Sequence, residues 1–599
     1  MIALDIDSGT GPRRVDLLDY VEPTQEERAH EDARRWIKAV RHARVDGRSV
    51  RSRFTYRGDS LWWFAELYLH KEHAALTVLR ILSAFDSLVD RERPLAVTHV
   101  SGGYPGVIAH AAATRKIRYN GAGWPRAAGW LARMNARALG LAVAARASRL
   151  RQPSTPPGHA QVAAFVHRAF WRPDAGDGGA ESYIGPVLKA LESRIGTAGV
   201  RYVGIGPRSN YRARRWWQAA LPASEHGIVP IEQYAPAGAM TASRALFTQR
   251  HEIRRALWAS PDLRAHAVIR GCDCWPLIRE QLAGIALLQF PWSARAMDEA
   301  AAALRAIEPA VAVTYAEAGG WGRALALECR RAGVPLAGLQ HGFIYRHWMN
   351  YRHEPDEVLP DPENREDRGF PFPASTLLFD DYASSHLTTA GGFPTTAVEV
   401  TGSARLDELV SAVRSLDAGA VDRARAEAGA SDARPLVLFA AKEREARRSL
   451  PALIAAVREM PELQLAIKPH PAETPDVYRA VASGASNVSV LPASVALPPL
   501  LAASRVIVTV NSTVAIDAMS LGLPAIVIGL PNNLTPFVEA GAMVGANSTA
   551  EIRAALARVL YDQEFRKTTE QEMAARSAVA GGRSAVRSAD AILRLTKAN

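Results

Sequence analysis

The sequence predicts an α/β protein that has two parallel sheets and an additional N-terminal α/β region. The first observation is that short apolar, β-branched segments alternate with helical patterns in two stretches, 310–345 and 463–530. This alternation is typical of parallel βαβ units. The second observation is that polar side chains directly follow the predicted strands of both stretches. Open α/β sheets bind ligands at the carboxyl ends of their strands, so a ligand site is expected there.

The first 150 residues have the weakest pattern, and we expect an N-terminal α/β extension of unknown role there. Residues 95–117 predict a strand, a Gly-rich turn and a helix. Residues 124–150 predict a helix rich in Ala, Leu and Arg. This helix either packs on the surface of the protein or lies with its basic face on a membrane. The sequence RQPSTPPG at 151–158 predicts a linker.

A second unit begins after this linker. Residues 161–170 predict a strand and residues 183–195 predict a helix, with a polar Gly-rich loop between them. That loop carries Asp177 and Glu181, two carboxylates that would face the cleft of a two-domain protein. A solvated acidic loop is the alternative interpretation of these residues.

The clearest βαβ unit of this second part lies at 310–345. Glu317 follows its first strand and His341 follows its second strand, so both side chains are expected at the same edge of one sheet. Each is a candidate general base, because carboxyl and imidazole groups can be tuned to accept protons near neutral pH. A purely structural role is the alternative for each.

The stretch 463–530 carries the densest polar chemistry. Five polar residues follow its first two strands: Lys468, His470, Asn511, Ser512 and Thr513. The last three open a predicted helix, whose N-terminal N–H groups favour an anion. Together these groups predict a site for the phosphate or diphosphate of a nucleotide, although helix capping is the alternative for Ser512 or Thr513. Lys442 and Arg444 follow another predicted strand and are expected at the same edge.

Four motifs carry a resemblance to a known family. KPHP at 468–471 and NSTVAIDAMSLGLPAIVIG at 511–529 resemble the donor domain of bacterial surface-polysaccharide transferases with the GT-B fold, in which two Rossmann-like domains face a cleft. This group includes polysialyltransferases, capsule Kdo transferases and CDP-glycerol glycerophosphotransferases. LQHGFIY at 339–345 is similar to the His-Gly motif of the glycerophosphotransferases, and VTGSARLDEL at 400–409 also fits.

The resemblance implies an inverting transfer of a sugar, acidic sugars included, from a CMP-, CDP- or UDP-linked donor to a surface polysaccharide or glycolipid. In this group the HP motif and the later Ser-Ser/Thr motif contact the donor phosphate, which gives that role to His470, Ser512 and Thr513. The His of the His-Gly motif, here His341, is a candidate base, and Glu317 is its substitute or orienter. His470 could also protonate the leaving phosphate. Lys442 and Arg444 would suit a carboxylate on the donor.

The resemblance also divides the chain. Asp177 and Glu181 fall on the acceptor side, where they are loosely similar to the acidic base motif of bacterial sialyltransferases. A C-terminal helix in GT-B proteins often crosses back to the first domain. We therefore expect an extension at 1–150, an acceptor-side Rossmann-like domain at 158–371, a donor domain at 372–575 and a C-terminal helix at 576–599.

No cofactor and no obligatory metal ion are expected. No DxD motif follows a predicted strand, and the side chains named above already cover the phosphate role. The pair Asp380-Asp381 follows a strand and argues the other way. The three cysteines, Cys272, Cys274 and Cys329, are too few for a disulfide framework and fit a reducing compartment.

The composition limits the partners. A net charge of +11 can indicate nucleic acid, an anionic membrane surface or an acidic substrate. The basic residues are scattered and no nucleic-acid recognition motif is present, so no nucleic-acid partner is expected. No signal peptide and no run of about eighteen apolar residues occur. These absences predict a cytoplasmic protein, with peripheral contact at the inner face of an anionic membrane as an option.

Three alternatives stay open on the sequence. Non-hydrolysing UDP-N-acetylglucosamine 2-epimerases share the fold and the TGS motif at 401–403, but they are usually much shorter and lack the N-terminal extension. A non-catalytic scaffold of a polysaccharide assembly complex would keep the fold, although intact His341 and His470 argue against it. A nucleic-acid binder is suggested by charge alone.

Overall fold

The structure is a computed structural model that describes residues 2–124, 129–150, 158–172, 179–206, 227–315, 317–430, 434–442, 446–470, 473–578 and 581–597. Within these ranges, no helix combines the length and the apolar character needed to cross a membrane. The predicted site residues Asp177 and Arg444 lie outside the described residues.

The first Rossmann-like domain is built on a seven-stranded parallel sheet with the order β13-β12-β9-β16-β17-β18-β19. Its central strands are apolar and buried, because hydrophobic clusters cover both faces of the sheet. The order reverses between β9 and β16, which creates a topological switch point at the carboxyl edge. The strands are β9 (Val162–His167), β12 (Val200–Ile205), β13 (Val229–Pro230), β16 (Val311–Tyr315), β17 (Leu336–Leu339), β18 (Ser375–Leu378) and β19 (Val398–Val400).

The second Rossmann-like domain has a six-stranded parallel sheet with the order β22-β21-β20-β23-β24-β25. Its switch point lies between β20 and β23. The strands are β20 (Leu436–Ala441), β21 (Gln464–Pro469), β22 (Val488–Val490), β23 (Val506–Thr509), β24 (Ala525–Ile528) and β25 (Val544–Ala546). The prediction of an α/β fold with two Rossmann-like domains is therefore confirmed.

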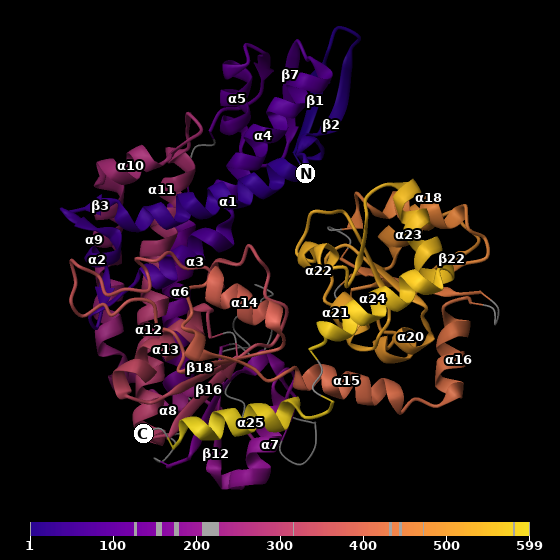
Figure 1. Cartoon of the computed structure of the whole chain (residues 1–599). Helices are drawn as coiled ribbons and strands as arrows, with labels where there is room; N and C mark the ends of the chain where they lie inside the picture. The colour runs from indigo at the N-terminus through magenta and orange to yellow at the C-terminus, as the bar shows by residue number, and fades with distance from the viewer. Residues whose placement is uncertain are drawn as a thin grey trace.

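The boundary between the two sheets lies later than the predicted position, residue 372. Strand β18 pairs with β17 and β19 pairs with β18, so both belong to the first sheet. Helix α15 (Ala404–Arg414) then leads toward the second domain, where the first strand of the second sheet begins at Leu436 (Figure 1). Strands of three and four residues carry too little local pattern to indicate which sheet they join.

The N-terminal extension contains a four-stranded sheet with the order β2-β1-β7-β8, and it rises above the rest of the molecule in Figure 1. The strands are β1 (Ala3–Asp7), β2 (Pro12–Asp16), β7 (Ala96–Ser101) and β8 (Arg118–Asn120). Its main helices are α1 (Pro23–Ala39), α2 (Val50–Arg53), α3 (Trp62–Glu72), α4 (Ala74–Glu92), α5 (Pro105–Thr114) and α6 (Trp130–Leu150). Helices α1 to α5 share one hydrophobic core with later helices of the chain. The predicted extension is thus present, but within the described residues it has no hydrophobic core of its own and packs together with later helices.

The remaining helices cover the two sheets. In the first half they are α7 (Gly185–Ile195), α8 (Ile231–Tyr234), α9 (Thr241–Ala259), α10 (Pro261–His266), α11 (Trp275–Gly284), α12 (Phe290–Ile307), α13 (Gly320–Ala332) and α14 (Asp381–Thr389). In the second half they are α16 (Ala418–Glu427), α18 (Leu450–Arg458), α19 (Asp476–Ala482), α20 (Leu497–Ala503), α21 (Val514–Ser520), α22 (Thr535–Glu539), α23 (Thr549–Tyr561) and α24 (Gln563–Ala575).

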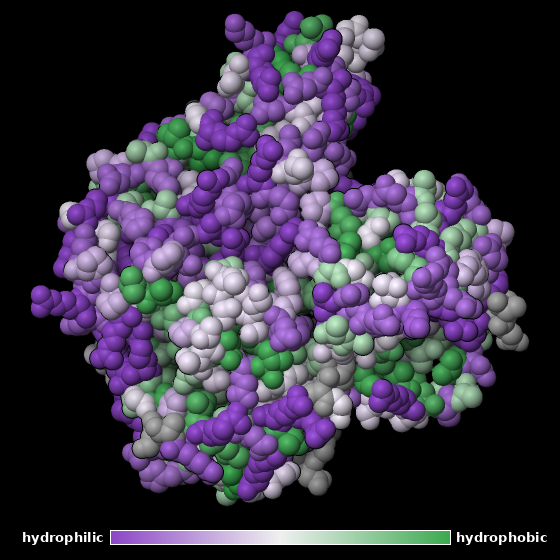
Figure 2. Space-filling view, viewed as in Figure 1, coloured by the Kyte–Doolittle hydropathy of each residue, from purple (hydrophilic) through white to green (hydrophobic). Residues whose placement is uncertain are grey.

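The acidic segment 353–373 joins the extension to the first domain. The buried carboxylate of Glu357 accepts a hydrogen bond from Lys38 of α1 at 2.6 Å. Asp367 accepts one from Arg51 of α2 at 2.9 Å, and both side chains are buried. Buried charges persist only when they are paired, so these ion pairs account for the ordered path of a segment without periodicity. Figure 2 shows the mainly hydrophilic surface over this half of the molecule.

The C-terminal helix α25 (Ser584–Leu595) crosses back to the first domain, where it lies beside α7 (Figure 1). Ala589 and Ile592 are buried in the core of that domain. The hydroxyl of Ser588 donates to Thr401, the residue that follows β19, at 2.9 Å. The two Rossmann-like domains are therefore tied by α15 and by the chain that returns to α25.

Candidate functional site

A cluster of acid–base side chains lies at the carboxyl edge of the first sheet, beside its switch point. It consists of Glu181, Tyr183, Tyr315 and His341, and we call it the acid–base cluster. Tyr315 ends β16, and His341 follows β17. The His341 ring centroid lies 5.2 Å from that of Tyr315 and 5.4 Å from that of Tyr183. The same edge of one sheet therefore holds the predicted base His341 and the predicted acceptor-side carboxylate Glu181.

Glu181 is buried and binds the backbone just before α7. Its Oε2 accepts the backbone N–H of Tyr183 at 2.7 Å and that of Ile184. Its Oε1 is buried without a hydrogen-bond partner among the described residues. Burial raises the pKa of Glu181 to about 7, and the backbone N–H groups that it accepts offset part of that rise. A carboxyl group that titrates near neutral pH is typical of catalytic sites.

His341 and Tyr183 are the partly exposed members of the cluster, so a ligand can reach these two side chains. Burial lowers the pKa of His341 to about 4. The imidazole is therefore neutral at physiological pH and can accept a proton.

Glu317 occupies a different environment from the one that the sequence predicts. Its side chain is 3% exposed and packs against Gly338 of β17, where any side chain would clash with it. Neither carboxyl oxygen has a hydrogen-bond partner among the described residues, and Tyr351 is its polar neighbour. Burial raises the pKa of Glu317 to about 7, which the nearby Tyr351 hydroxyl partly offsets. Nothing in the described structure joins Glu317 to His341.

Two lysines and a histidine lie at the carboxyl edge of the second sheet, and we call Lys442, Lys468 and His470 the cationic edge. Lys468 is the second-last residue of strand β21, whereas the sequence predicted that it would follow the strand. Its Nζ donates to the carbonyl of Ala493 at 3.4 Å. His470 and Lys442 are exposed directly after β21 and β20. Burial lowers the pKa of His470, and the charges of Lys442 and Lys468 lower it further, whereas Glu473 raises it.

Asn511, Ser512 and Thr513 connect β23 to α21, as predicted from the sequence. The hydroxyl of Ser512 accepts the N–H of Val514 at 3.3 Å, so the capping alternative applies to Ser512. The side chain of Thr513 is exposed and makes no capping bond. Asn511 has a buried Oδ1 without a hydrogen-bond partner in the described structure. A buried unpaired amide oxygen beside a strand end is a candidate ligand contact.

Two contacts bring the edges of the two sheets toward each other. Phe343, two residues after His341, packs against Phe537 of α22 with ring centroids 5.5 Å apart. Arg405 of α15 bonds Asp517 of α21 at 2.6 Å. Burial raises the pKa of Tyr183 in the acid–base cluster, and the charge of Arg405 offsets part of that rise. The acid–base cluster and the helix that follows Thr513 therefore share a neighbour. Figure 1 shows α21 and α22 on the side of the second domain that faces the first.

No group of three or more His, Cys, Asp or Glu side chains in the described ranges is arranged to hold a metal ion. Asp380 caps α14 by accepting the N–H of Ala383 at 2.8 Å, so this residue of the Asp380-Asp381 pair has a structural role. Cys272 and Cys274 are buried free thiols.

The tyrosines of the cluster are the functional candidates that the sequence did not indicate. Tyr315 is the last residue of a predicted strand, a position that open α/β sheets use for ligand contacts, and that rule could have found it. Tyr183 lies one residue before the N-cap of α7, where sequence periodicity indicated only a helix.

No family model matches the sequence. No curated protein matches it either. Among solved structures, the chain is similar to the UDP-GlcNAc 2-epimerase from Neisseria meningitidis bound to UDP-GlcNAc, at 15% identity over 73% of this chain and 99% of that chain, with a TM-score of 0.43. It is also similar to the UDP-GlcNAc 2-epimerase from Methanocaldococcus jannaschii in complex with UDP-GlcNAc and UDP, at 14% identity over 73% and 99% of the two chains, with a TM-score of 0.40. CalG4, the calicheamicin glycosyltransferase, is similar at 14% identity over 73% and 98%, with a TM-score of 0.39.

Proposed function

We propose that the protein is an inverting glycosyltransferase that moves a sugar from a nucleotide-activated donor to a hydroxyl of a surface polysaccharide or glycolipid. One observation carries the proposal: two facing sheet edges hold complementary chemistry. The first edge offers a neutral imidazole at His341, and the second offers the cationic edge together with Asn511, Ser512 and Thr513. Group transfer needs a base for the acceptor and stabilising groups for the leaving phosphate.

In this proposal His341 takes the proton of the acceptor hydroxyl as its oxygen attacks the anomeric carbon. The bond between that carbon and the phosphate oxygen breaks, and its electrons leave with the phosphate. Lys468, His470 and Thr513 stabilise the charge that develops on the nucleotide. Glu181 is too buried to touch the acceptor and acts as a positioning residue through Tyr183 and Tyr315. The phosphate charge is met by side chains, so the proposal includes no metal ion.

The first test is thermal stabilisation of the protein by CMP, CDP, UDP, GDP and ADP, in EDTA and again with magnesium. A nucleotide at a hundredfold excess over its Kd stabilises the folded state by about 2.7 kcal/mol. We expect one cytidine nucleotide to raise the melting temperature without metal. His470→Ala and Ser512→Ala should abolish the rise, whereas Lys567→Ala, an exposed cation of the same domain, should keep it.

Other outcomes of this test identify other functions. Stabilisation by UDP alone would favour a UDP-sugar transferase or the epimerase alternative. No stabilisation by any nucleotide would contradict the transferase proposal and favour a non-catalytic scaffold.

The second test is the pH dependence of kcat/KM with the donor that the first test identifies. A base with a pKa of about 4 must be unprotonated, so we expect the rate to rise up to about pH 4 and then stay level through neutral pH. His341→Ala should lower kcat by about a hundredfold or more. His159→Ala, which removes an exposed imidazole elsewhere, should leave it unchanged. A rising limb near pH 7 instead would contradict His341 as the base and assign that role to a carboxyl group, either Glu181 or Glu317.

A further inference from the structure

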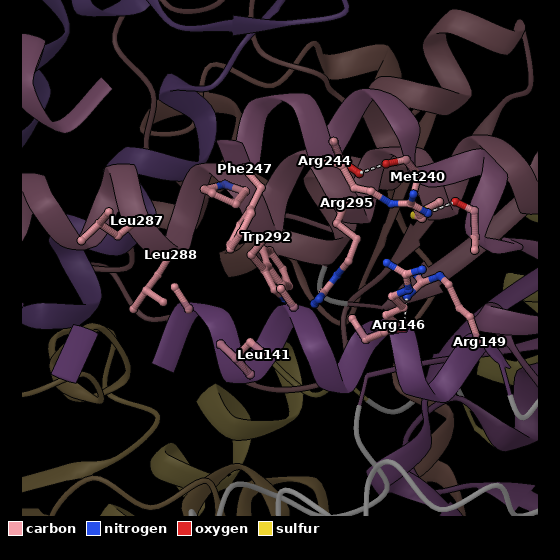
Figure 3. A pocket seen from close by; sticks show the side chains of 16 residues that line it. Leu141, Arg146, Arg149, Met240, Arg244, Phe247, Leu287, Leu288, Trp292 and Arg295 are labelled. Atoms are coloured by element: carbon pink, nitrogen blue, oxygen red, sulfur yellow. Dashed lines mark hydrogen bonds between the residues drawn. The ribbon is translucent and has the colours of Figure 1, made fainter. Parts of the chain in front are cut away.

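A cavity of about 120 Å³ lies between α6 on one side and α9 and α12 on the other, outside the candidate site (Figure 3). Apolar side chains from these helices and from the π-helical segment Ile285–Gln289 before α12 line most of it, among them Leu141, Phe247, Leu287, Leu288 and Trp292. We call this cavity the α6 groove. Its apolar lining suits a hydrocarbon chain, which gains free energy in proportion to the apolar surface that leaves water.

Arginines gather at the other end of the α6 groove, away from Leu287 and Leu288 (Figure 3). Arg149 is buried and satisfied, since it bonds Glu299 and donates to the carbonyl of Ala235 at 3.0 Å. Arg295 lies 3.7 Å from the same Glu299. Arg146 and Arg244 are exposed and have no carboxylate partner among the described residues. The carboxylates of Glu299 and Glu232 both lie near Arg149, so the positive charge at this end that no described carboxylate offsets comes from Arg146 and Arg244.

The outer surface of α6 is apolar as well. Leu139 and Val143 are 48% and 65% exposed, on the helix that carries Leu141 and Arg146. Exposed apolar side chains beside clustered arginines are the combination found on surfaces that bind anionic membranes. Charge complementarity thus selects an anionic amphiphile over a neutral one.

We propose that the α6 groove binds one anionic membrane phospholipid. An acyl chain lies between Leu141 and Trp292, the phosphate meets Arg146 and Arg244, and the bilayer surface covers Leu139 and Val143. The site attaches the protein to the membrane surface without a spanning helix. This proposal does not depend on the transfer reaction, because the lining residues of the α6 groove belong to neither sheet edge.

The test is co-sedimentation of the full chain with vesicles of phosphatidylcholine alone and of equal parts phosphatidylcholine and phosphatidylglycerol. We expect binding to the anionic vesicles only. Each arginine near an anionic membrane surface contributes about a factor of five to affinity, so the double variant Arg146→Ala/Arg244→Ala should bind roughly 30-fold more weakly. The charge-matched control Lys567→Ala/Arg587→Ala, on exposed helices of the second half of the chain, should bind like the wild type.

A second pair of variants tests whether a chain enters the α6 groove. Ala142 lines it, so Ala142→Trp should fill it and weaken vesicle binding, whereas Ala132→Trp, at an exposed position of the same helix outside the α6 groove, should not. Unchanged melting temperatures without lipid show that the variants fold. Calorimetric titration with dodecyl phosphate, dodecyl maltoside and inorganic phosphate distinguishes binding of the hydrocarbon chain from binding of the phosphate charge. Only dodecyl phosphate is expected to bind.

Three results would overturn the proposal. Equal weakening by the charge-matched control would mean general attraction of a basic protein to an anionic surface. Undiminished binding by Ala142→Trp would mean that no chain enters the α6 groove. Binding of inorganic phosphate as tightly as dodecyl phosphate would mean an anion site without a lipid.

Discussion

At the residue scale, Glu317 shows how a strand-end carboxyl group can serve the fold instead of the reaction. Burial raises its pKa from 4.5 to about 7, so the folded state binds the proton more tightly than the unfolded chain. The contribution of Glu317 to stability is therefore fully present below about pH 4.5 and is lost as the pH rises to about 7. At about 1.36 kcal/mol per pKa unit, ionising this group above pH 7 costs about 3 kcal/mol.

We expect Glu317→Gln to be more stable than the wild type by about 3 kcal/mol at pH 8 and nearly equal to it at pH 4.5. Denaturant unfolding of the full chain at both pH values, followed in the first domain, measures this difference in the free energy of unfolding. Glu539→Gln, at an exposed position of α22, should change stability at neither pH. Destabilisation of Glu317→Gln at pH 8 would mean that the carboxylate has a cationic partner and that its burial is not the cause of the shift.

At the scale of elements, sequence patterns predicted the helices and strands whose positions depend on neighbouring residues in the chain. The helix expected near Val514 begins at that residue, and the apolar segments at 463–467, 506–510 and 525–529 correspond to β21, β23 and β24. The acidic segment 353–373 could only be predicted as a loop. Its order depends on ion pairs such as the one between Asp367 and Arg51, which are 316 residues apart in the chain. No local pattern encodes such a pairing.

The candidate site divides in the same way. His341, His470 and Ser512 could be placed at strand ends because parallel strands end at a common edge. The difference in surroundings between Glu181 and Glu317 could not be predicted, since both are acidic residues in loops of the same domain. Glu181 gains Tyr183 and Tyr315 as neighbours, and these two tyrosines contact His341, whereas Glu317 is enclosed beside Gly338. These contacts depend on how separate strands and loops pack.

At the scale of the whole molecule, the extension and the first Rossmann-like domain form one packed unit, and the second domain forms another. Buried ion pairs cross the first unit: Lys38 of α1 bonds both Glu357 and Glu66, and Glu66 also bonds Arg323 of α13. The hydrophobic core of the extension continues into α11, α12 and α13. The hydrophobic clusters around the second sheet draw mainly on residues after Leu406. Stability should therefore be shared within each unit more than between them.

A change at Glu357 tests this division. Glu357→Gln leaves two buried cations, Lys38 and Arg323, with the single carboxylate of Glu66, and breaking a buried pair in this way costs about 3–5 kcal/mol. We expect the extension and the first domain to lose stability together while the second domain is unchanged, as measured by hydrogen exchange of peptides from each unit during denaturant unfolding. Asp476→Asn, which removes an exposed ion pair with Arg479, should change stability by less than about 0.5 kcal/mol. Loss of protection in the extension alone would show that the extension is an independent domain. The ion pairs that segment 353–373 makes with the extension would then be contacts between two domains and not part of the interior of a single domain.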